Sequence, residues 1–289
     1  MLPAVSLSVT ASQAYCTQVA RQTGRNFYHA FRVLPRDQRV DMSTLYAFMR
    51  YTDDLADEGD DEDAKRAALD AWKSHVESAL ADGDLDASPI LPALSEMVRR
   101  REIPHEHFYT VIAGCRSDVG GVAIETYDQL RDYCYKVAGV VGLCCLHIWG
   151  YDGSDAAHHK AIDTGAALQL TNILRDLRED TSAERYYLPA DDLRRFGVTR
   201  QQLRKGYQTD EYLKLMEFEC QRARGLYGRA ESLMPHLEKG GRKALAAMLK
   251  IYGGLLDEIE RREYDVYSSR VSVPWHRKLT AVVSALFKR

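Results

Sequence analysis

Apolar residues recur three and four positions apart along most of the chain. Leu45, Phe48 and Met49 show this spacing, and the stretch 213–218 repeats it. This is the period of one face of an α-helix. Strand-like alternation bounded by Asn-Gly or Asp-Gly turns is hard to find. The pattern therefore predicts an all-α protein.

Short connections separate the predicted helices. Gly83, Gly153 and Gly197 fall between periodic segments, and Ala81 to Pro92 is the clearest loop. No tandem repeat and no low-complexity linker divides the chain. A single domain over residues 1–289 is therefore expected, in the form of a helical bundle.

Composition constrains the compartment and the partners. The 289 residues are 45% hydrophobic and 28% charged, as in globular proteins that bury a large core. A formal net charge of -3 and the lack of a basic block argue against nucleic acid as a partner. The six cysteines include no CxxC pair and favour a reducing cytosol.

Targeting and membrane-spanning segments are not expected. The N-terminus lacks the charged segment that precedes the apolar stretch of a secretory signal. The longest apolar run, Val137 to Leu146, is shorter than the roughly 20 residues that cross a bilayer. The sequence thus predicts a cytoplasmic protein that does not span the membrane.

Two clusters of polar side chains follow apolar helical sequence: Asp53, Asp54 and Asp57, and then Asn172, Asp176 and Asp180, with Gln169 one turn earlier. Residues four apart share one face of a helix, so the members of each cluster project together. Like charges at this spacing repel unless a cation lies between them. Oxygen ligands of this kind suit Mg²⁺, whose shell is completed by water and substrate phosphates.

Other interpretations of these clusters exist. The first cluster continues into the acidic run 58–63, which is typical of a solvated helix end. The second follows the apolar stretch 166–168, where an unpaired carboxylate is costly. A di-iron carboxylate bundle would need two Glu-x-x-His pairs, and the one match, Glu102 to His105, contains a proline.

Four stretches resemble the squalene/phytoene synthase family, the head-to-head all-trans prenyl diphosphate synthases. They are NFYHAF at 26–31 with Leu34-Pro35, YAFMRYTDDLAD at 46–57, YCYKVAGVVG at 133–142, and QLTNILRDLRED at 169–180 continuing to RYYLP at 185–189. The similarity covers about residues 15 to 270. The runs at 142–150 and 275–279 look closer to the bacterial presqualene diphosphate/squalene synthase branch.

The resemblance implies an all-α isoprenoid-synthase fold whose central cavity binds Mg²⁺ and diphosphates. It implies metal ligands at Asp53, Asp54, Asp57, Asn172, Asp176 and Asp180. It implies substrate-binding residues at Arg25, Phe27, Arg50, Gln169, Arg185, Tyr187 and Arg270. Tyr46, Tyr135 and Tyr252 are expected to face the cavity and to stabilise carbocations, with buried structural tyrosine as the alternative. The stretch 118–121 departs from the family pattern and leaves the role of Asp118 open.

The implied activity is an Mg²⁺-dependent condensation of two prenyl diphosphates with loss of diphosphate. Two farnesyl diphosphates giving presqualene diphosphate or squalene are favoured, with phytoene from geranylgeranyl diphosphate or dehydrosqualene as alternatives. The use of NADPH stays open, because this family does not bind it through GxGxxG. The alternative of another class is a non-catalytic helical protein that binds isoprenoids.

Two further segments each have two interpretations. In Val137 to Leu146, the small residues Ala138, Gly139 and Gly142 suit either a cavity wall or close helix packing. At the C-terminus, 275–289 predicts a basic amphipathic helix, with Leu279, Val282, Val283 and Leu286 at helical spacing beside Arg277, Lys278, Lys288 and Arg289. That helix either packs on the protein body or makes peripheral contact with the inner face of a membrane.

Overall fold

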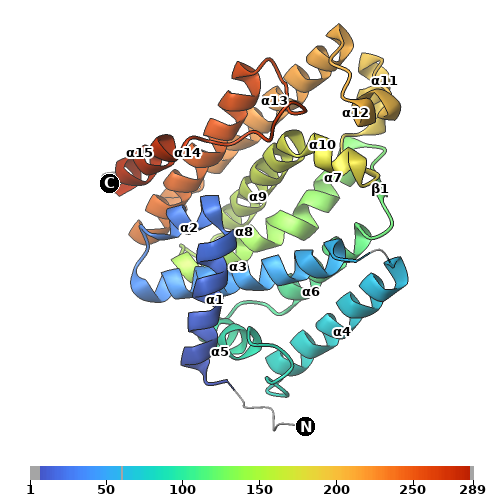
Figure 1. Cartoon of the computed structure of the whole chain (residues 1–289). Helices are drawn as coiled ribbons and strands as arrows, with labels where there is room; N and C mark the ends of the chain where they lie inside the picture. Colours follow the sequence, from blue (N-terminus) through green and yellow to red (C-terminus); the bar gives the residue numbers. More distant parts are fainter. Residues whose placement is uncertain (1–6, 60, 287–289) are drawn as a thin grey trace.

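A computed structural model describes residues 7–59 and 61–286, with only the backbone of Arg25, Asn26 and Leu286. The described part is almost entirely helical, which confirms the predicted all-α class (Figure 1). Its α-helices are α1 (Val9–Thr23), α2 (Arg25–Phe31), α3 (Arg36–Asp57), α4 (Glu62–Leu80), α5 (Leu91–Arg101), α6 (Glu106–Ser117), α7 (Tyr127–Cys134), α8 (Val140–Trp149), α9 (Asp155–Arg175), α10 (Leu177–Ser182), α11 (Ala190–Phe196), α12 (Arg200–Lys205), α13 (Asp210–Glu231), α14 (Lys239–Arg261) and α15 (Trp275–Leu286). A π-helical turn (Tyr135–Gly139) joins α7 to α8, and a 3-10 turn (Met234–His236) precedes α14.

Local sequence sets several of these helix ends. Ser154 caps α9, its hydroxyl accepting a hydrogen bond from the Ala157 amide at 3.2 Å. Thr126 begins α7 with a capping box to Gln129. Gly197 ends α11 in the left-handed conformation that glycine adopts without strain. The predicted loop after Ala81 is also present, between α4 and α5.

The centre of the fold is built from helices that come from distant parts of the chain. Helix α9 packs on α8, α13 and α14, and α3 packs on α8. In Figure 1, α3 crosses the middle of the molecule, with α8 and α9 above it and α14 higher still. The apolar core runs continuously from α1 to α15 among the described residues.

Small residues bring two of these backbones very close together. A Cβ added at Gly142 would lie 2.4 Å from the carbonyl oxygen of Ala161, and one at Gly165 would lie 2.3 Å from that of Ala138. Gly142 and Ala138 also line a cavity. The two interpretations of this segment, close helix packing and a cavity wall, therefore both hold.

A two-stranded parallel sheet is the element that the sequence did not predict. Strands β1 (Val122–Ala123) and β2 (Arg185–Tyr186) are only two residues long, too short to show alternation. They pair Val122 with Arg185. This pairing brings the end of α6 next to the segment after α10.

Two helical details differ from the expectation. The stripe from Asn172 to Asp180 is not one continuous helix, because α9 ends at Arg175 and Asp176 leaves the helical conformation before α10. In α15, Ala281 and Ala285 are buried, whereas Leu279 and Val283 face outward with 51% and 43% of their surface exposed. Leu279 and Val283 of the predicted apolar face therefore do not pack on the protein body, whereas Val282 is half-buried; Lys288, Arg289 and the Leu286 side chain lie outside the described residues.

The cysteines and the helix lengths agree with the sequence. All six cysteines are buried and form no disulfide. None of the described helices combines the length and apolar content that a bilayer crossing requires.

The close crossing at Gly165 generates a stability prediction. Gly165→Ala should force the two backbones apart and lower the free energy of unfolding by about 1–3 kcal/mol. Gly225→Ala is the matched control, because Gly225 lies within α13 and a Cβ there meets nothing within 4 Å. That control should gain about 0.5–1 kcal/mol. Urea unfolding measures both, and equal effects of the two changes would contradict the close-packing account.

Candidate active site

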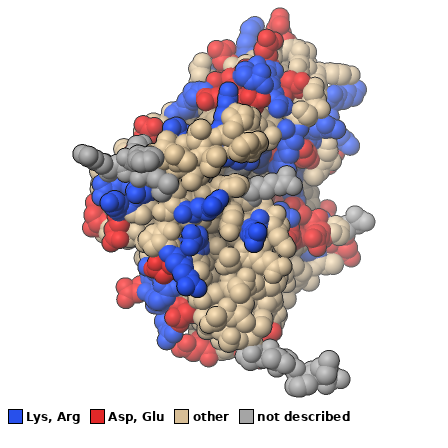
Figure 2. All heavy atoms as spheres, turned by 60° about the vertical axis from the view of Figure 1, so that its left-hand side comes forward, with Lys and Arg blue, Asp and Glu red and all other residues tan. Residues whose placement is uncertain are grey.

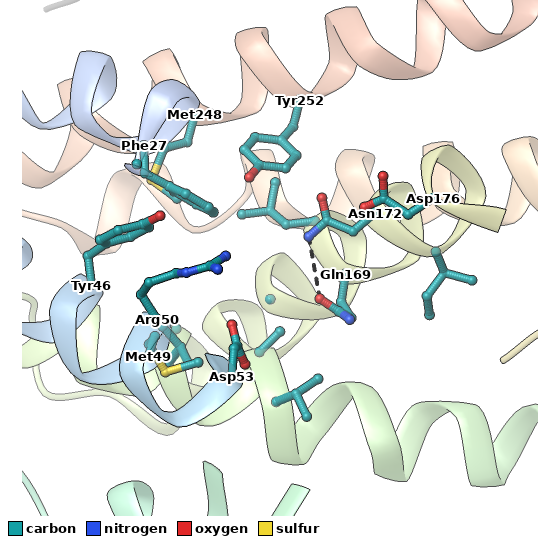
Figure 3. Close-up of a pocket in the computed structure, with 18 of the residues that line it drawn as sticks. Phe27, Tyr46, Met49, Arg50, Asp53, Gln169, Asn172, Asp176, Met248 and Tyr252 are labelled. Atoms are coloured by element: carbon teal, nitrogen blue, oxygen red, sulfur yellow. Dashed lines mark hydrogen bonds between the residues drawn. The ribbon is translucent and has the colours of Figure 1, made fainter. Parts of the chain in front are cut away.

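A cavity of about 680 Å³ opens between α3, α9 and α14. Acidic, amide and basic side chains line one end of it, and the rest of its wall is mainly apolar and aromatic. Figure 3 shows the polar end, where side chains from α3 and α9 point toward the same space. Such an arrangement suits a ligand with a charged head and a hydrocarbon tail.

The end of α3 contributes the first acidic cluster. Asp53 and Asp57 line the cavity, as their four-residue spacing predicts. The Cys115 thiol donates a hydrogen bond to Oδ1 of Asp53 at 3.3 Å. Asp54 does not line the cavity, and its carboxylate forms an ion pair with Arg50 instead. The structure therefore separates Asp54 from the other two carboxylates.

The end of α9 contributes the second cluster. Gln169, Asn172, Asp176 and Asp180 all line the cavity. The Asn172 side-chain amide donates to the Gln169 side-chain oxygen at 3.4 Å, which Figure 3 marks. The side-chain oxygen of Asn172 is buried and accepts no hydrogen bond. A buried acceptor without a partner is costly unless a ligand or water satisfies it.

Asp176 is held between two arginines. The Nε of Arg175 donates to its Oδ1 at 2.8 Å, and Arg270 lies 3.0 Å from the same oxygen. Burial opposes the charge of Arg175, but Asp176 outweighs this and raises the pKa of the guanidinium. Arg175 lines the cavity and was not among the residues expected from the sequence.

Two further arginines complete the polar end. Nη2 of Arg185 lies 2.8 Å from Oδ1 of Asp57, and Arg50 pairs with Asp54 across one helical turn. Arg50 and Arg185 line the cavity, as expected. Guanidinium groups grip phosphate oxygens in a bidentate manner, so this end can bind diphosphate as well as carboxylate.

The short sheet brings Asp118, whose role the sequence left open, into a network of polar side chains. Strand β2 carries Arg185, and the segment before β1 places Asp118 on the same cavity wall. The Tyr133 hydroxyl donates to Oδ2 of Asp118 at 2.9 Å. Tyr133 stacks on Tyr187, with ring centroids 4.8 Å apart. Asp118 Oδ1 is buried without a hydrogen-bond partner, so this carboxylate lines the cavity with an acceptor that no described protein group satisfies.

Three cavity carboxyls titrate well above their usual range. Burial raises the pKa of Asp53 to about 6 although its side chain faces the open cavity. Burial, with the charge of Asp176 as the next cause, raises the pKa of Asp180 to about 7. Burial also raises the pKa of Asp118 to about 7, despite the hydrogen bond from Tyr133. Negative charge is thus held here at a cost in free energy.

Aromatic rings line the wall next to the polar end. Phe27 lies 5.2 Å from Tyr252 and 6.1 Å from Tyr46, measured between ring centroids, and all three line the cavity (Figure 3). Tyr135 does not line it and is 36% exposed. The expectation that Tyr135 faces the cavity is therefore wrong, and Tyr133 takes that place. The Arg25 side chain lies outside what the structure describes.

The oxygen donors of this cavity fit a magnesium ion whose remaining ligands come from water and a bound substrate. Within the described residues, no three His, Cys, Asp or Glu side chains gather closely enough to hold a metal alone. Asp53, Asp57, Asp176 and Asp180 are nevertheless hard oxygen donors on one cavity, and the Asn172 oxygen lacks a partner. Mg²⁺ takes one or two protein carboxylates and completes its shell with water and phosphate, as this arrangement requires.

Known proteins match nearly the whole chain. Residues 20–277 match the family model described as Squalene/phytoene synthase. The phytoene synthase of Arthrospira platensis is 35% identical, over 96% of this chain and 94% of its own length. The phytoene synthase of Mycobacterium tuberculosis is 36% identical, over 95% of this chain and 91% of its own length.

Solved structures agree. A dehydrosqualene synthase in complex with ligand has a TM-score of 0.88 and 29% identity, over 96% of each chain. The squalene synthase HpnC from Alicyclobacillus acidocaldarius has a TM-score of 0.81 and 29% identity, over 90% of this chain and 97% of its own. These similarities confirm the all-α isoprenoid-synthase fold and set aside the non-catalytic alternative. The chain belongs to the squalene/phytoene synthase family of prenyltransferases, which condense prenyl diphosphates head to head.

Proposed function

We propose that this enzyme condenses two geranylgeranyl diphosphates, with Mg²⁺, along the route to phytoene. The observation that carries the proposal is the pair of acidic helix ends, on α3 and α9, at one end of an apolar cavity. The sequence alone favoured farnesyl diphosphate. The names of the relatives, phytoene synthases at 35% and 36% identity over almost the whole chain, support the longer substrate instead.

We propose that Asp53, Asp57, Asn172, Asp176 and Asp180 hold the magnesium ions. Bound Mg²⁺ would neutralise diphosphate charge and so stabilise the leaving group. Asp54 acts through Arg50, because its carboxylate is paired with that guanidinium and does not line the cavity. The role of a metal ligand is therefore assigned to five of the six residues that the resemblance implied.

The arginines bind the diphosphates. Arg50, Arg175, Arg185 and Arg270 exchange their carboxylate partners for phosphate oxygens when substrate enters. The C–O bond of one substrate then breaks, and its electron pair leaves with the diphosphate. The double bond of the second substrate attacks the resulting allylic cation, and loss of one proton gives a cyclopropylcarbinyl diphosphate.

The apolar and aromatic wall protects the cation. Phe27, Tyr46 and Tyr252 present ring faces or hydroxyls to the cavity beside the polar end. Their packing excludes water, which would otherwise capture the cation. At the polar end, Gln169 positions Asn172 by accepting a hydrogen bond from its side-chain amide, and Tyr187 stacks on Tyr133.

Product analysis tests this proposal. Purified protein is incubated with farnesyl or geranylgeranyl diphosphate, with Mg²⁺ or EDTA, and with or without NADPH. We expect diphosphate release with Mg²⁺ only, and a phytoene-type product from geranylgeranyl diphosphate without NADPH. Turnover of farnesyl diphosphate alone would assign the chain to the squalene or dehydrosqualene branch, which the solved structures at 29% identity favour. No release from either substrate would overturn the proposed activity.

The separation of Asp53 from Asp54 gives a mutational prediction. Asp53→Asn should lower kcat/KM by about 100-fold or more, because a lost metal ligand costs several kcal/mol of transition-state stabilisation. Asp54→Asn is the matched control on the same helix, and it should cost about tenfold or less because only the Arg50 ion pair is lost. An equal or larger loss in Asp54→Asn would contradict these assignments.

The raised pKa of Asp180 predicts that replacing this carboxyl stabilises the protein at high pH and has less effect at low pH. The folded protein binds this proton more tightly than the unfolded chain, so the free energy of unfolding falls as pH rises from about 4 to about 7. In EDTA at pH 8, Asp180→Asn should raise Tm by about 2–4 °C, equivalent to about 1 kcal/mol. The difference from wild type should shrink toward pH 5, as calorimetry would show. A pH-independent difference would point to a cause other than charge.

We also propose that the C-terminal helix makes peripheral contact with a membrane surface. Trp275, Leu279 and Val283 are exposed on one side of α15, which supports this contact.

A further inference from the structure

Acidic residues are absent from three segments of the chain. Residues 1–36, 239–256 and 266–289 contain thirteen Lys and Arg residues and no Asp or Glu. The remaining residues contain twenty-six basic and all forty-two acidic residues, so their formal net charge is −16, although the whole chain carries only −3. The charge of this protein is therefore strongly divided along its sequence.

The described parts of these segments pack together. Helices α2, α14 and α15 contact one another pairwise, and we call the outer surface of α2, of α15 and of residues 239–256 of α14 the basic face. Lys250 of α14 donates to the Ser284 hydroxyl of α15 at 2.8 Å. Burial and the nearby charges of Lys278 of α15 and Arg32, at the end of α2, lower the pKa of His29. In Figure 2, the middle of this side is mainly tan with blue groups, and red groups lie mainly toward its edges.

An apolar stripe runs along the same face. Trp275, Leu279 and Val283 are spaced four residues apart and are 75%, 51% and 43% exposed. Ala281 and Ala285, on the other side of α15, are buried against the protein. The helix thus keeps its small residues for packing and presents its large apolar residues outward, beside Arg277.

The cavity reaches this face. Thr23 and Ser272 are exposed to solvent and also line the cavity, so the cavity meets solvent at the end of α1 and at the segment before α15. Phe27 of α2 and Lys278 of α15 line it nearby. The apolar stripe therefore lies on the helix that borders an opening of the cavity.

We propose that the basic face docks on an anionic phospholipid bilayer, with Trp275, Leu279 and Val283 entering the boundary between headgroups and acyl chains. This deepens the peripheral contact proposed above and rests on it. Cations around a narrow apolar stripe match the charge and the apolar layer of such a surface. Docking also turns an opening of the cavity toward the bilayer, so a hydrocarbon product can leave without crossing water.

A second copy of this chain fits the face less well than a bilayer. A twofold dimer through this surface would place the same cations opposite one another. Like charges across an interface disfavour association. An anionic bilayer instead meets these cations with opposite charge.

Vesicle co-sedimentation of the full-length protein tests the docking face. The vesicles contain phosphatidylcholine alone or with phosphatidylglycerol, at low and high salt. The wild type should bind the mixed vesicles, bind neutral ones more weakly, and be released by salt. The variant Trp275→Ser/Leu279→Ser/Val283→Ser should bind at least about tenfold more weakly. The control Tyr207→Ser removes an apolar residue of 52% exposure elsewhere and should bind as the wild type does.

Diphosphate release separates this inference from the proposed function. Since vesicle binding needs no turnover, loss of docking with unchanged release from dispersed substrate supports the inference. Equal vesicle binding by the wild type and the triple variant would overturn it. A wild-type dimer in sedimentation analysis that the triple variant lacks would assign the stripe to a second copy and would also overturn it. Circular dichroism of each variant verifies that the helices are intact.

Discussion

Repulsion between neighbouring carboxylates within two acidic clusters, one at the end of α3 and one beyond α9, is the constraint on which this structure depends. Asp53 and Asp57 at the end of α3 share one cavity with Asp176 and Asp180 beyond α9. Burial raises the pKa of Asp53 and Asp180, so ionising these two carboxyls costs free energy. Such charges are tolerated only where cations balance them. Arginines supply that balance without ligand, and the proposed metal and diphosphate supply it during turnover.

The rest of the fold holds these charges in place. Close crossings at Gly142 and Gly165 pack α8, α9 and the π-helical turn tightly against one another, so the end of α9 that carries the second cluster is held in place. The short sheet fixes Arg185 next to Asp57 and brings Asp118 to the same wall. The polar end thus lowers the free energy of unfolding, and packing in the apolar core compensates for this loss, as is common at active sites.

The sequence predicted those site residues whose side-chain type suits the chemistry and whose spacing places them on one face of a regular helix. Asp53 and Asp57 lie four apart in a regular helix, so their shared face follows from helical geometry alone. The π-helical turn at Tyr135–Gly139 adds a residue to one turn and so rotates the preceding helix, α7, relative to α8. For this reason Tyr133, and not Tyr135, faces the cavity. Asp118 depends on a two-residue strand pairing across more than sixty positions, for which the sequence carries no local signal. Arg175 stood inside the second motif but carried no separate signal that distinguished it from a surface arginine.

The central claim is that metal and diphosphate bind together and replace the ion pairs between arginine and carboxylate. Equilibrium dialysis of inorganic pyrophosphate against the full-length protein, with Mg²⁺ or with EDTA, tests it directly. The account predicts binding at least about tenfold tighter with Mg²⁺, because the carboxylates otherwise keep the arginines occupied and repel the anion. Equal binding in EDTA would show that the arginines alone hold the diphosphate, and would contradict the account.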